Sequence, residues 1–372
     1  MKVSAAIISI CLTLLLSCLG CSKEEPPHPP VQNYKVVMPI KRPAPEKAAA
    51  SLTGTSLPQE QRSSFEAWLG SFRKEAFDSG ISQKTLDAAF TGLEPIPQVI
   101  ELDRSQPEFK LTLKEYLHRV VSENRISKGR KKLKENRTLL KRVASRYGLE
   151  PRFLVALWGI ETDFGSSSGS FPVIGSLTAL AYDSRRSSYF RKELIHALRI
   201  LDEGHMSIAQ MKGSWAGAMG QLQFMPSTFR FFAVDFDGDG RIDIWKDCGD
   251  VFASAANYLL RAGWKRDRTW GQEVRLPNGL NQALIGLEYR KRLSEWQALG
   301  LRCLDGEDLP TLDLLSSVIQ PDGPAGRAFL VYSNYHCILK WNHSHNFAIA
   351  VGILSDRIGR LKGFTQIHAF KN

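Results

Sequence analysis

Glu161 stands at the end of an apolar run, where a carboxylate can act as an acid/base catalyst. Residues 153–158 are apolar on every side, which is the pattern of a helix buried inside a protein. A carboxylate among apolar neighbours resists ionisation, so we expect the pKa of Glu161 to rise toward neutrality. A general acid that cleaves glycosidic bonds needs such a pKa. Most glutamates are caps, ion pairs or surface residues, but the apolar run disfavours surface placement. Asp163 is the local competitor for the catalytic role.

A second segment, residues 213–227, combines small, amide and aromatic side chains. Its glycines let a backbone approach a ligand closely. Ser214 and Gln223 can hydrogen-bond neutral sugar hydroxyls and N-acetyl groups, while the faces of Trp215 and Phe224 can pack on sugar rings. The same composition is typical of a tightly packed junction between a loop and a helix. The segment by itself therefore leaves both interpretations open.

An acidic loop, residues 235–243, reproduces the first part of an EF-hand. Glycine at its sixth position permits the sharp turn, and four other positions would supply oxygen ligands: Asp235, Asp237, Asp239 and the backbone carbonyl of Arg241. The twelfth position is Lys246, which cannot ligate a cation, but Asp250 can close a longer loop. Oxygen ligands without histidine or thiolate favour Ca²⁺ over zinc. We expect a structural calcium ion; an acidic turn without metal is the alternative.

Composition and charge limit the class of protein. Of 372 residues, 43% are hydrophobic and 23% charged, as in a folded globular protein. A chain of this length can bury a sizeable core, so the fold does not depend on disulfides. Much of the net charge of +11 lies between residues 110 and 146, a pattern that favours polyanions such as nucleic acid, anionic lipid or an acidic wall polymer. No zinc-finger or RNA-binding signature accompanies it, which argues against nucleic acid.

The N-terminus predicts a compartment. The apolar run at residues 3–16 follows Lys2 and is too short to span a membrane comfortably, which is typical of a signal peptide. Leu-Leu-Ser-Cys, ending at Cys18, resembles the lipobox of a lipidated cysteine, and Cys21 is a second candidate. Lipidation would anchor the chain rather than make it span; an ordinary cleaved signal is the alternative. The proline-rich stretch that follows predicts an extended, semi-rigid tether.

Helical patterns dominate the rest of the chain. Helical spacing of apolar residues, with Pro151 at a helix start, indicates helices within residues 65–72, 111–120, 139–147, 188–201, 250–260 and 347–358. Glycine and proline punctuation indicates a small β-rich insertion at residues 264–324. Of the six cysteines, Cys248, Cys303 and Cys337 lie outside the leader, an odd number that leaves one disulfide and one free thiol open.

These motifs together resemble the membrane-bound lytic murein transglycosylase B family. The resemblance extends over roughly residues 64–360 and rests on residues 158–165, 213–227, 340–344 and the upstream motif at 101–109. It implies that Glu161 is the sole catalytic acid/base. It also implies that a glycan groove is lined by Tyr116, Ser214, Gln223, Tyr258 and Asn342. In that family the calcium loop is lengthened, and Asp250 falls at its last ligand.

The resemblance further implies a mainly α (α+β) fold, with a lysozyme-like helical core. Applied to this chain, it predicts a signal peptide at 1–20, a tether at 21–62, a helical subdomain at 63–140, a catalytic core with the EF-hand-like loop at 141–263, the β-rich insertion at 264–324 and the end of the core at 325–372. The expected location is the periplasm, with a lipid anchor in the outer membrane. The expected partners are peptidoglycan glycan strands and other cell-wall enzymes.

The implied reaction is not hydrolysis. The bond between N-acetylmuramic acid and N-acetylglucosamine breaks, and the muramoyl C6 hydroxyl closes a 1,6-anhydro ring. A retaining hydrolase needs a second carboxylate about 5 Å from the acid, but attack by the substrate's own groups makes it dispensable. Two alternatives remain. A non-catalytic wall-binding lipoprotein is disfavoured by the retained Glu161, Ser214, Gln223 and Asn342. A lysozyme-type muramidase would share Glu161, and only the products distinguish it.

Overall fold

The computed structural model describes residues 59–105, 111–183 and 186–360. The expected signal peptide, with Cys18 and Cys21, lies outside these residues, as do almost all of the expected tether and the end of the 101–109 motif. The described residues belong to one compact unit. Within them, no helix combines the length and apolarity needed to cross a membrane.

Helices make up most of the described chain. They are α1 (Gln59–Asp78), α2 (Gln83–Phe90), α3 (Pro97–Arg104), α4 (Leu113–Val120), α5 (Glu123–Glu135), α6 (Arg137–Tyr147), α7 (Pro151–Thr162), α8 (Val173–Tyr182), α9 (Ser187–Asp202), α10 (Pro226–Phe232), α11 (Cys248–Arg261), α12 (Leu293–Ala298), α13 (Ser333–Trp341), α14 (His345–Gly359) and the short 3-10 helix η1 (Gln282–Leu284). The strands are β1 (Phe171–Pro172), β2 (Lys212–Gly213), β3 (Gly271–Arg275), β4 (Lys291–Arg292), β5 (Arg302–Cys303), β6 (Leu315–Ile319) and β7 (Ala328–Val331).

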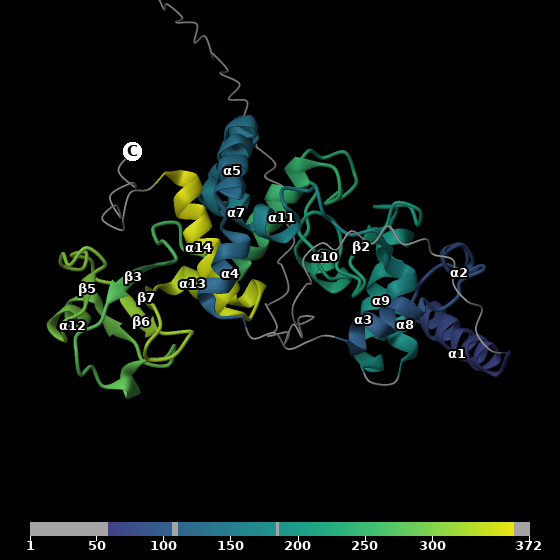
Figure 1. The fold of residues 1–372 in the computed structure, drawn as a ribbon. Helices are drawn as coiled ribbons and strands as arrows, with labels where there is room; N and C mark the ends of the chain where they lie inside the picture. The colour runs from purple at the N-terminus through teal and green to yellow at the C-terminus, as the bar shows by residue number, and fades with distance from the viewer. Residues whose placement is uncertain (1–58, 106–110, 184–185, 361–372) are drawn as a thin grey trace, which may run out of the picture. The chain divides into compact units, whose positions relative to one another are not determined.

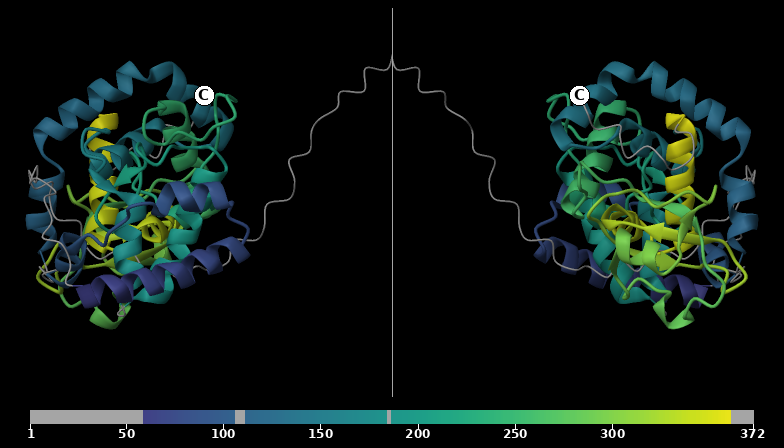
Figure 2. Two further views of the ribbon diagram at one scale, coloured as in Figure 1. Left: turned by 90° about the vertical axis from the view of Figure 1, so that its right-hand side faces the viewer. Right: turned by 90° about the vertical axis from the view of Figure 1, so that its left-hand side faces the viewer.

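Helix α7 is the central helix of the α-helical part. It begins at Pro151, whose fixed φ suits a first helical turn, and nearly all of its side chains are buried. It packs against α5, α6, α11 and α14 (Figure 1). Figure 2 shows α14, in yellow, from both sides; this helix also packs on α5. A helix that is apolar on every side needs such neighbours, so the expected buried helix around residues 153–158 is confirmed.

The N-terminal helices cover the α8–α9 pair. Helix α3 packs on α8 and α2 packs on α9, while α9 also contacts α10 (Figure 1). Trp68 and Phe72 of α1 stack with their ring centroids 5.5 Å apart, and Arg191 of α9 lies over both rings. Helices α1 and α2 therefore support α9, against which α10 packs.

The small sheet builds a second apolar core. Its strands are antiparallel in the order β4-β6-β7-β3-β5, and Val318 pairs with Leu330 in the register of β6 and β7. Trp296 of α12 is fully buried in the same cluster. Strands β3 to β6 fall within residues 264–324, the stretch predicted to be β-rich, and β7 follows it. The mainly helical fold with a small β-rich part is confirmed, while the predicted subdomain boundaries stay a prediction.

The three cysteines outside the leader are free thiols. Cys303 donates to the backbone carbonyl of Asp308 at 3.3 Å, and Cys337 lies 3.5 Å from the carbonyl of Ala262. Burial raises the pKa of the Cys337 thiol to about 11, so it stays protonated near neutral pH. The disulfide that the sequence left open is not formed among these residues.

Trp270 joins the sheet to the helical part. Its backbone carbonyl accepts a hydrogen bond from Tyr332 N at 2.9 Å, and its Nε1 donates to Asp356 Oδ2 of α14, also at 2.9 Å. The ring is fully buried and lies directly on Gly352 of α14, where a Cβ atom would overlap it. Gly352 therefore permits the close approach of Trp270 to α14.

Replacing Gly352 by alanine should destabilise the protein. The added methyl group meets a buried indole that has no room to move, so Gly352→Ala should lower the free energy of unfolding by about 1–3 kcal/mol. Gly70→Ala is the matched control, because it lies in α1 with open space around it. It should stabilise by up to about 1 kcal/mol, as alanine is the better helix former. Urea unfolding of both variants checks this; equal effects would contradict the packing at Trp270.

Candidate active site

Glu161 lies at the C-terminal end of α7 and is only 6% exposed. Trp341, the last residue of α13, donates from its indole Nε1 to Glu161 Oε1 at 2.8 Å. The donor lies 180 residues further along the chain, so tertiary packing creates this contact. The expected burial of Glu161 is confirmed.

An aromatic cluster fixes the position of Trp341. The ring of Tyr258 meets it edge-on with centroids 4.9 Å apart, and Phe224 lies 5.2 Å away. The hydroxyl of Tyr258 donates to the backbone carbonyl of Lys340 at 2.6 Å. Burial raises the pKa of the Tyr258 phenol, so it remains a donor. Tyr258, which was predicted to line a groove, is buried and contacts Trp341, the residue that donates to Glu161.

The chain turns sharply after Glu161. Asp163, Phe164 and Gly165 follow in succession with φ of 50°, 61° and 82°. The left-handed region costs energy for residues other than glycine and persists only where neighbours hold it. Lys128 of α5 supplies one such neighbour, since its Nζ donates to Asp163 Oδ2 at 2.7 Å and to the Asp163 carbonyl at 3.0 Å.

The charge of Asp163 is balanced by cations of α5. Burial is the largest single influence and raises the pKa of Asp163. Hydrogen bonds from Lys128 and Ser166, with the charges of Lys128 and Arg125, outweigh burial and lower it. Arg125 Nε lies 3.6 Å from Asp163 Oδ1. The carboxylate named as the local competitor for catalysis is thus ionised and engaged with α5.

The segment at residues 213–227 is a tightly hydrogen-bonded loop that leads into α10. Ser214 N donates to the Ala218 carbonyl at 2.8 Å, and Ser214 Oγ accepts from Ala218 N at 3.0 Å. Gln223 has a φ of 53°, and its Nε2 donates to the carbonyls of Ser168 and Gly220 at 2.9 and 3.0 Å. The segment is packed as the junction interpretation predicts, and its role in binding sugars stays a prediction.

The two remaining residues that were predicted to line the groove lie on α4 and between α13 and α14. Asn342 caps the C-terminal end of α13, and its Oδ1 accepts from Ser344 N at 3.1 Å. Tyr116 is half-buried on α4, a helix that packs on α14. The structure thus gathers Glu161, Tyr258 and residues 341–342 at one place, with Gln223 next in sequence to Phe224, which contacts Trp341.

Sequence reasoning gave no role to two residues that the structure places at the site. Trp341 belongs to the motif at residues 340–344, but no local sequence pattern indicates its hydrogen bond to Glu161. Gln223, and not Gln221, was predicted as a site residue. Gln221 is nevertheless only 7% exposed and accepts a hydrogen bond from Trp158 Nε1 at 2.7 Å. Two glutamines in one loop look alike in sequence; only burial separates them.

The acidic loop folds as a cation-binding loop would. Carboxylate oxygens of Asp235, Asp237 and Asp250 lie within 4.8 Å of one another. Asp250 is 2% exposed, and its two oxygens accept from Phe236 N and Asp243 N, each at 2.7 Å. Three close carboxylates, one of them buried, repel one another unless a cation lies between them. The residues fit a calcium ion.

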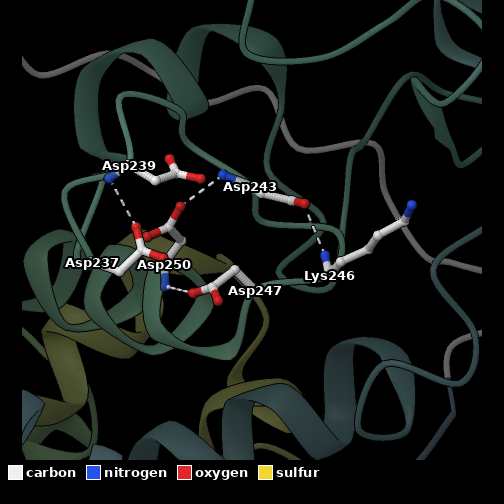
Figure 3. Close-up of a pocket in the computed structure, with 6 residues that line it drawn as sticks. All are labelled: Asp237, Asp239, Asp243, Lys246, Asp247 and Asp250. Atoms are coloured by element: carbon white, nitrogen blue, oxygen red, sulfur yellow. Dashed lines mark hydrogen bonds between the residues drawn. The ribbon is translucent and has the colours of Figure 1, made fainter.

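Figure 3 shows the pocket beside this cluster, with Asp239, Asp243, Asp247 and Lys246 around Asp237 and Asp250. The side chain of Lys246 points away from the carboxylates, as expected of a residue that cannot ligate. Burial raises the pKa of Asp250 to about 6, and the charges of Asp247 and Asp235 act in the same direction. Backbone amides satisfy Asp235, which accepts from Gly238 N and Gly240 N at 2.7 and 2.9 Å.

These features define a class of protein: a mainly helical body that buries one glutamate at the end of a core helix, beside a small-residue loop and an acidic loop. The family model for the transglycosylase SLT domain matches residues 64–356, and the chain belongs to that family.

Several relatives are known. The chain is 33% identical over 232 residues to membrane-bound lytic murein transglycosylase B of Escherichia coli (strain K12); the match covers 59% of this chain and 60% of that protein's length. SltB3 from Pseudomonas aeruginosa, in complex with NAG-anhNAM-pentapeptide, is 44% identical with a TM-score of 0.77 and 79% of both chains covered. The Escherichia coli lytic transglycosylase Slt35, in complex with calcium, is 26% identical with a TM-score of 0.68, over 78% of this chain and 92% of that one.

Removing the charge of Asp163 tests its pairing with α5. Asparagine tolerates the left-handed backbone, so Asp163→Asn changes charge and little else. Because its pKa is lowered in the folded protein, the ionised Asp163 stabilises the fold above a pH of about 4. This stabilisation is lost as the pH falls through the pKa of Asp163 in the folded protein. At pH 7 the variant should be less stable by up to about 1 kcal/mol, because the pair is partly exposed and screened. Urea unfolding measured from neutral to acid pH should show that the difference in unfolding free energy between wild type and variant becomes smaller. A difference that is independent of pH would contradict the pairing.

Proposed function

We propose that this chain is a lytic transglycosylase that cleaves the MurNAc-GlcNAc β-1,4 bond of peptidoglycan and leaves 1,6-anhydro-MurNAc ends. The observation that carries the proposal is the buried carboxylate of Glu161, which accepts a hydrogen bond from Trp341, while the neighbouring Asp163 is paired with Lys128. Family membership and the solved complex of SltB3 with a NAG-anhNAM peptide support it.

Glu161 would act twice. As an acid it protonates the glycosidic oxygen, so that the bond to the muramoyl C1 breaks and the leaving sugar departs as an alcohol. As a carboxylate it then accepts the proton of the C6 hydroxyl, whose oxygen bonds to C1 and closes the anhydro ring. The carboxyl group ends in its starting state, and no water is consumed. An intramolecular hydroxyl has a high effective concentration, which makes a second carboxylate unnecessary.

The predicted groove residues would place the sugars. The Gln223 side-chain carbonyl can accept from a hydroxyl or an N-acetyl N–H, because its amide is held by Ser168 and Gly220. Ser214 would offer a hydroxyl and Asn342 an amide, and Tyr116 would offer a half-buried ring. Tyr258 contributes indirectly, through Trp341.

The proposal extends to the location and the partners of the enzyme. The relative from Escherichia coli is a membrane-bound protein by name. For this chain we propose a lipid anchor at Cys18 or Cys21, the periplasmic face of the outer membrane as its location, and other cell-wall enzymes as partners. The proline-rich stretch would let the catalytic part reach glycan strands from that anchor.

Substitution of Glu161 tests the catalytic assignment. Glu161→Gln keeps the size of the side chain and an acceptor for Trp341 Nε1, but it cannot deliver a proton. Cleavage of purified peptidoglycan should fall by about 10²–10⁴-fold or more, while wall binding and the melting temperature are kept. Asp163→Asn is the matched control and should stay within about tenfold of wild type, since its carboxylate takes no part in proton transfer. Near-normal turnover by Glu161→Gln, or a collapse in Asp163→Asn alone, would refute the assignment.

We also propose that the acidic loop binds Ca²⁺ for structural reasons, with ligands from Asp235, Asp237, Asp239, Asp250 and the Arg241 carbonyl. The cluster of three carboxylates in this chain supports the site, and one solved relative is a calcium complex. A bound ion would offset the repulsion among these carboxylates and hold the loop against the start of α11.

Calcium should raise the melting temperature of the protein, because a ligand that binds only the folded state stabilises it by mass action. Asp235→Ala combined with Asp239→Ala should abolish the response to calcium and to chelator. Asp305→Ala with Asp308→Ala, two acidic residues of the small β-rich part, is the control and should keep it. Identical melting curves of wild type with calcium and with chelator would show an ordinary acidic turn.

A further inference from the structure

Gln221 connects three parts of the active-site region. Its backbone N–H donates to the Ile244 carbonyl and its side-chain Nε2 to the Trp245 carbonyl, both at 2.8 Å. Its side-chain Oε1 accepts from Trp158 Nε1 at 2.7 Å, and its backbone carbonyl accepts from Thr162 Oγ1 at 2.8 Å. A buried amide with this many partners is held in one orientation.

Two of these bonds reach the helical turn that carries Glu161. Trp158 precedes Glu161 by less than one turn of α7, and Thr162 follows it directly. Thr162 Oγ1 also accepts from Gly165 N at 3.1 Å, which ties the left-handed turn to the same point. Gln221 therefore binds residues on both sides of Glu161 in the last turn of α7.

The other two bonds reach the acidic loop. The carbonyls that Gln221 holds belong to a turn closed by Asp243, whose Oδ1 accepts from Trp245 N and Lys246 N at 2.8 and 2.9 Å. Asp243 is itself held by Asp250 through its backbone N–H. A continuous chain of hydrogen bonds thus runs from the carboxylate cluster to Gln221.

The packing around Gln221 is close. A Cβ atom at Gly165 would overlap the Gln221 side chain, and one at Gly220 would overlap Ile244. Both glycines have positive φ, 82° and 62°. Close packing of this kind transmits a displacement of one loop to its neighbour.

We infer that Gln221 is a positioning residue that couples cation binding at the acidic loop to the orientation of Glu161. The inference rests on the proposed function, because it concerns the same carboxylate. A cation among the carboxylates fixes the turn at Asp243, the turn fixes Gln221, and Gln221 fixes the end of α7. Such coupling is reciprocal, so a glycan bound at Glu161 must tighten the cation by the same factor.

The test measures the Ca²⁺ dissociation constant of the full chain by calorimetry, with and without a saturating GlcNAc tetrasaccharide. Wild type should bind Ca²⁺ about fivefold tighter with the sugar present. Gln221→Met keeps the volume and removes the side-chain hydrogen bonds; both ligands should still bind, but the ratio of the two constants should fall to about one. On peptidoglycan, kcat of this variant should fall about tenfold with a smaller change in KM, as expected when placement in the transition state is lost.

Two further variants complete the experiment. Trp158→Phe removes the bond to Gln221 Oε1 while keeping an aromatic ring in the core, and it should give an intermediate ratio, which keeps the test decisive if Gln221→Met folds poorly. Gln282→Met, an exposed glutamine of η1, is the control and should match wild type. If wild type cleaves peptidoglycan but binds Ca²⁺ equally well with and without the sugar, the coupling is overturned. The coupling is also overturned if Gln221→Met keeps the wild-type ratio of the two dissociation constants. Wild type that neither binds the sugar nor cleaves peptidoglycan would instead overturn the proposed function, and the coupling with it.

Discussion

The hydrogen bond from Trp341 Nε1 to Glu161 Oε1 is the contact around which the site is organised. A carboxylate that is 6% exposed costs free energy unless donors satisfy it. The indole can reach it only because Tyr258 and Phe224 pack on Trp341 and the Tyr258 hydroxyl holds the backbone at Lys340. The C-terminal helices therefore complete a site whose central residue lies much earlier in the chain.

The charge of Asp163, which follows α7, also affects the site. A charged Asp163 would repel an ionised Glu161 and, like burial, would disfavour the charged form of Glu161. Lys128 and Arg125 offset the charge of Asp163, and the same lysine holds the backbone in the left-handed turn. One side chain of α5 thus stabilises a strained turn and balances the charge of the carboxylate nearest to Glu161 in sequence.

Much of this could be predicted from the sequence, because some signals are local. The all-apolar run before Glu161 predicts its burial, and the spacing of Asp235, Asp237 and Asp239 predicts an acidic loop, since a few adjacent residues determine both. The contacts that orient the site are not local. Trp341 comes from the far end of the chain, and Gln221 differs from Gln223 only in what packs around it. Helix α13 was not anticipated, because its short apolar pattern is weak without its partners.

In the proposed reaction a single carboxylate suffices, because the substrate's own C6 hydroxyl attacks C1. This claim is tested most directly by mass spectrometry of the muropeptides that the wild-type chain releases from purified peptidoglycan. An anhydro end is lighter than a reducing end by the mass of one water, so the two products are unambiguous. The structure of the site predicts that 1,6-anhydromuramoyl ends dominate, with and without stem peptides on the glycan. A digest dominated by reducing muramic acid ends would contradict the claim and would identify a water-activating hydrolase in which a second carboxylate acts beside Glu161.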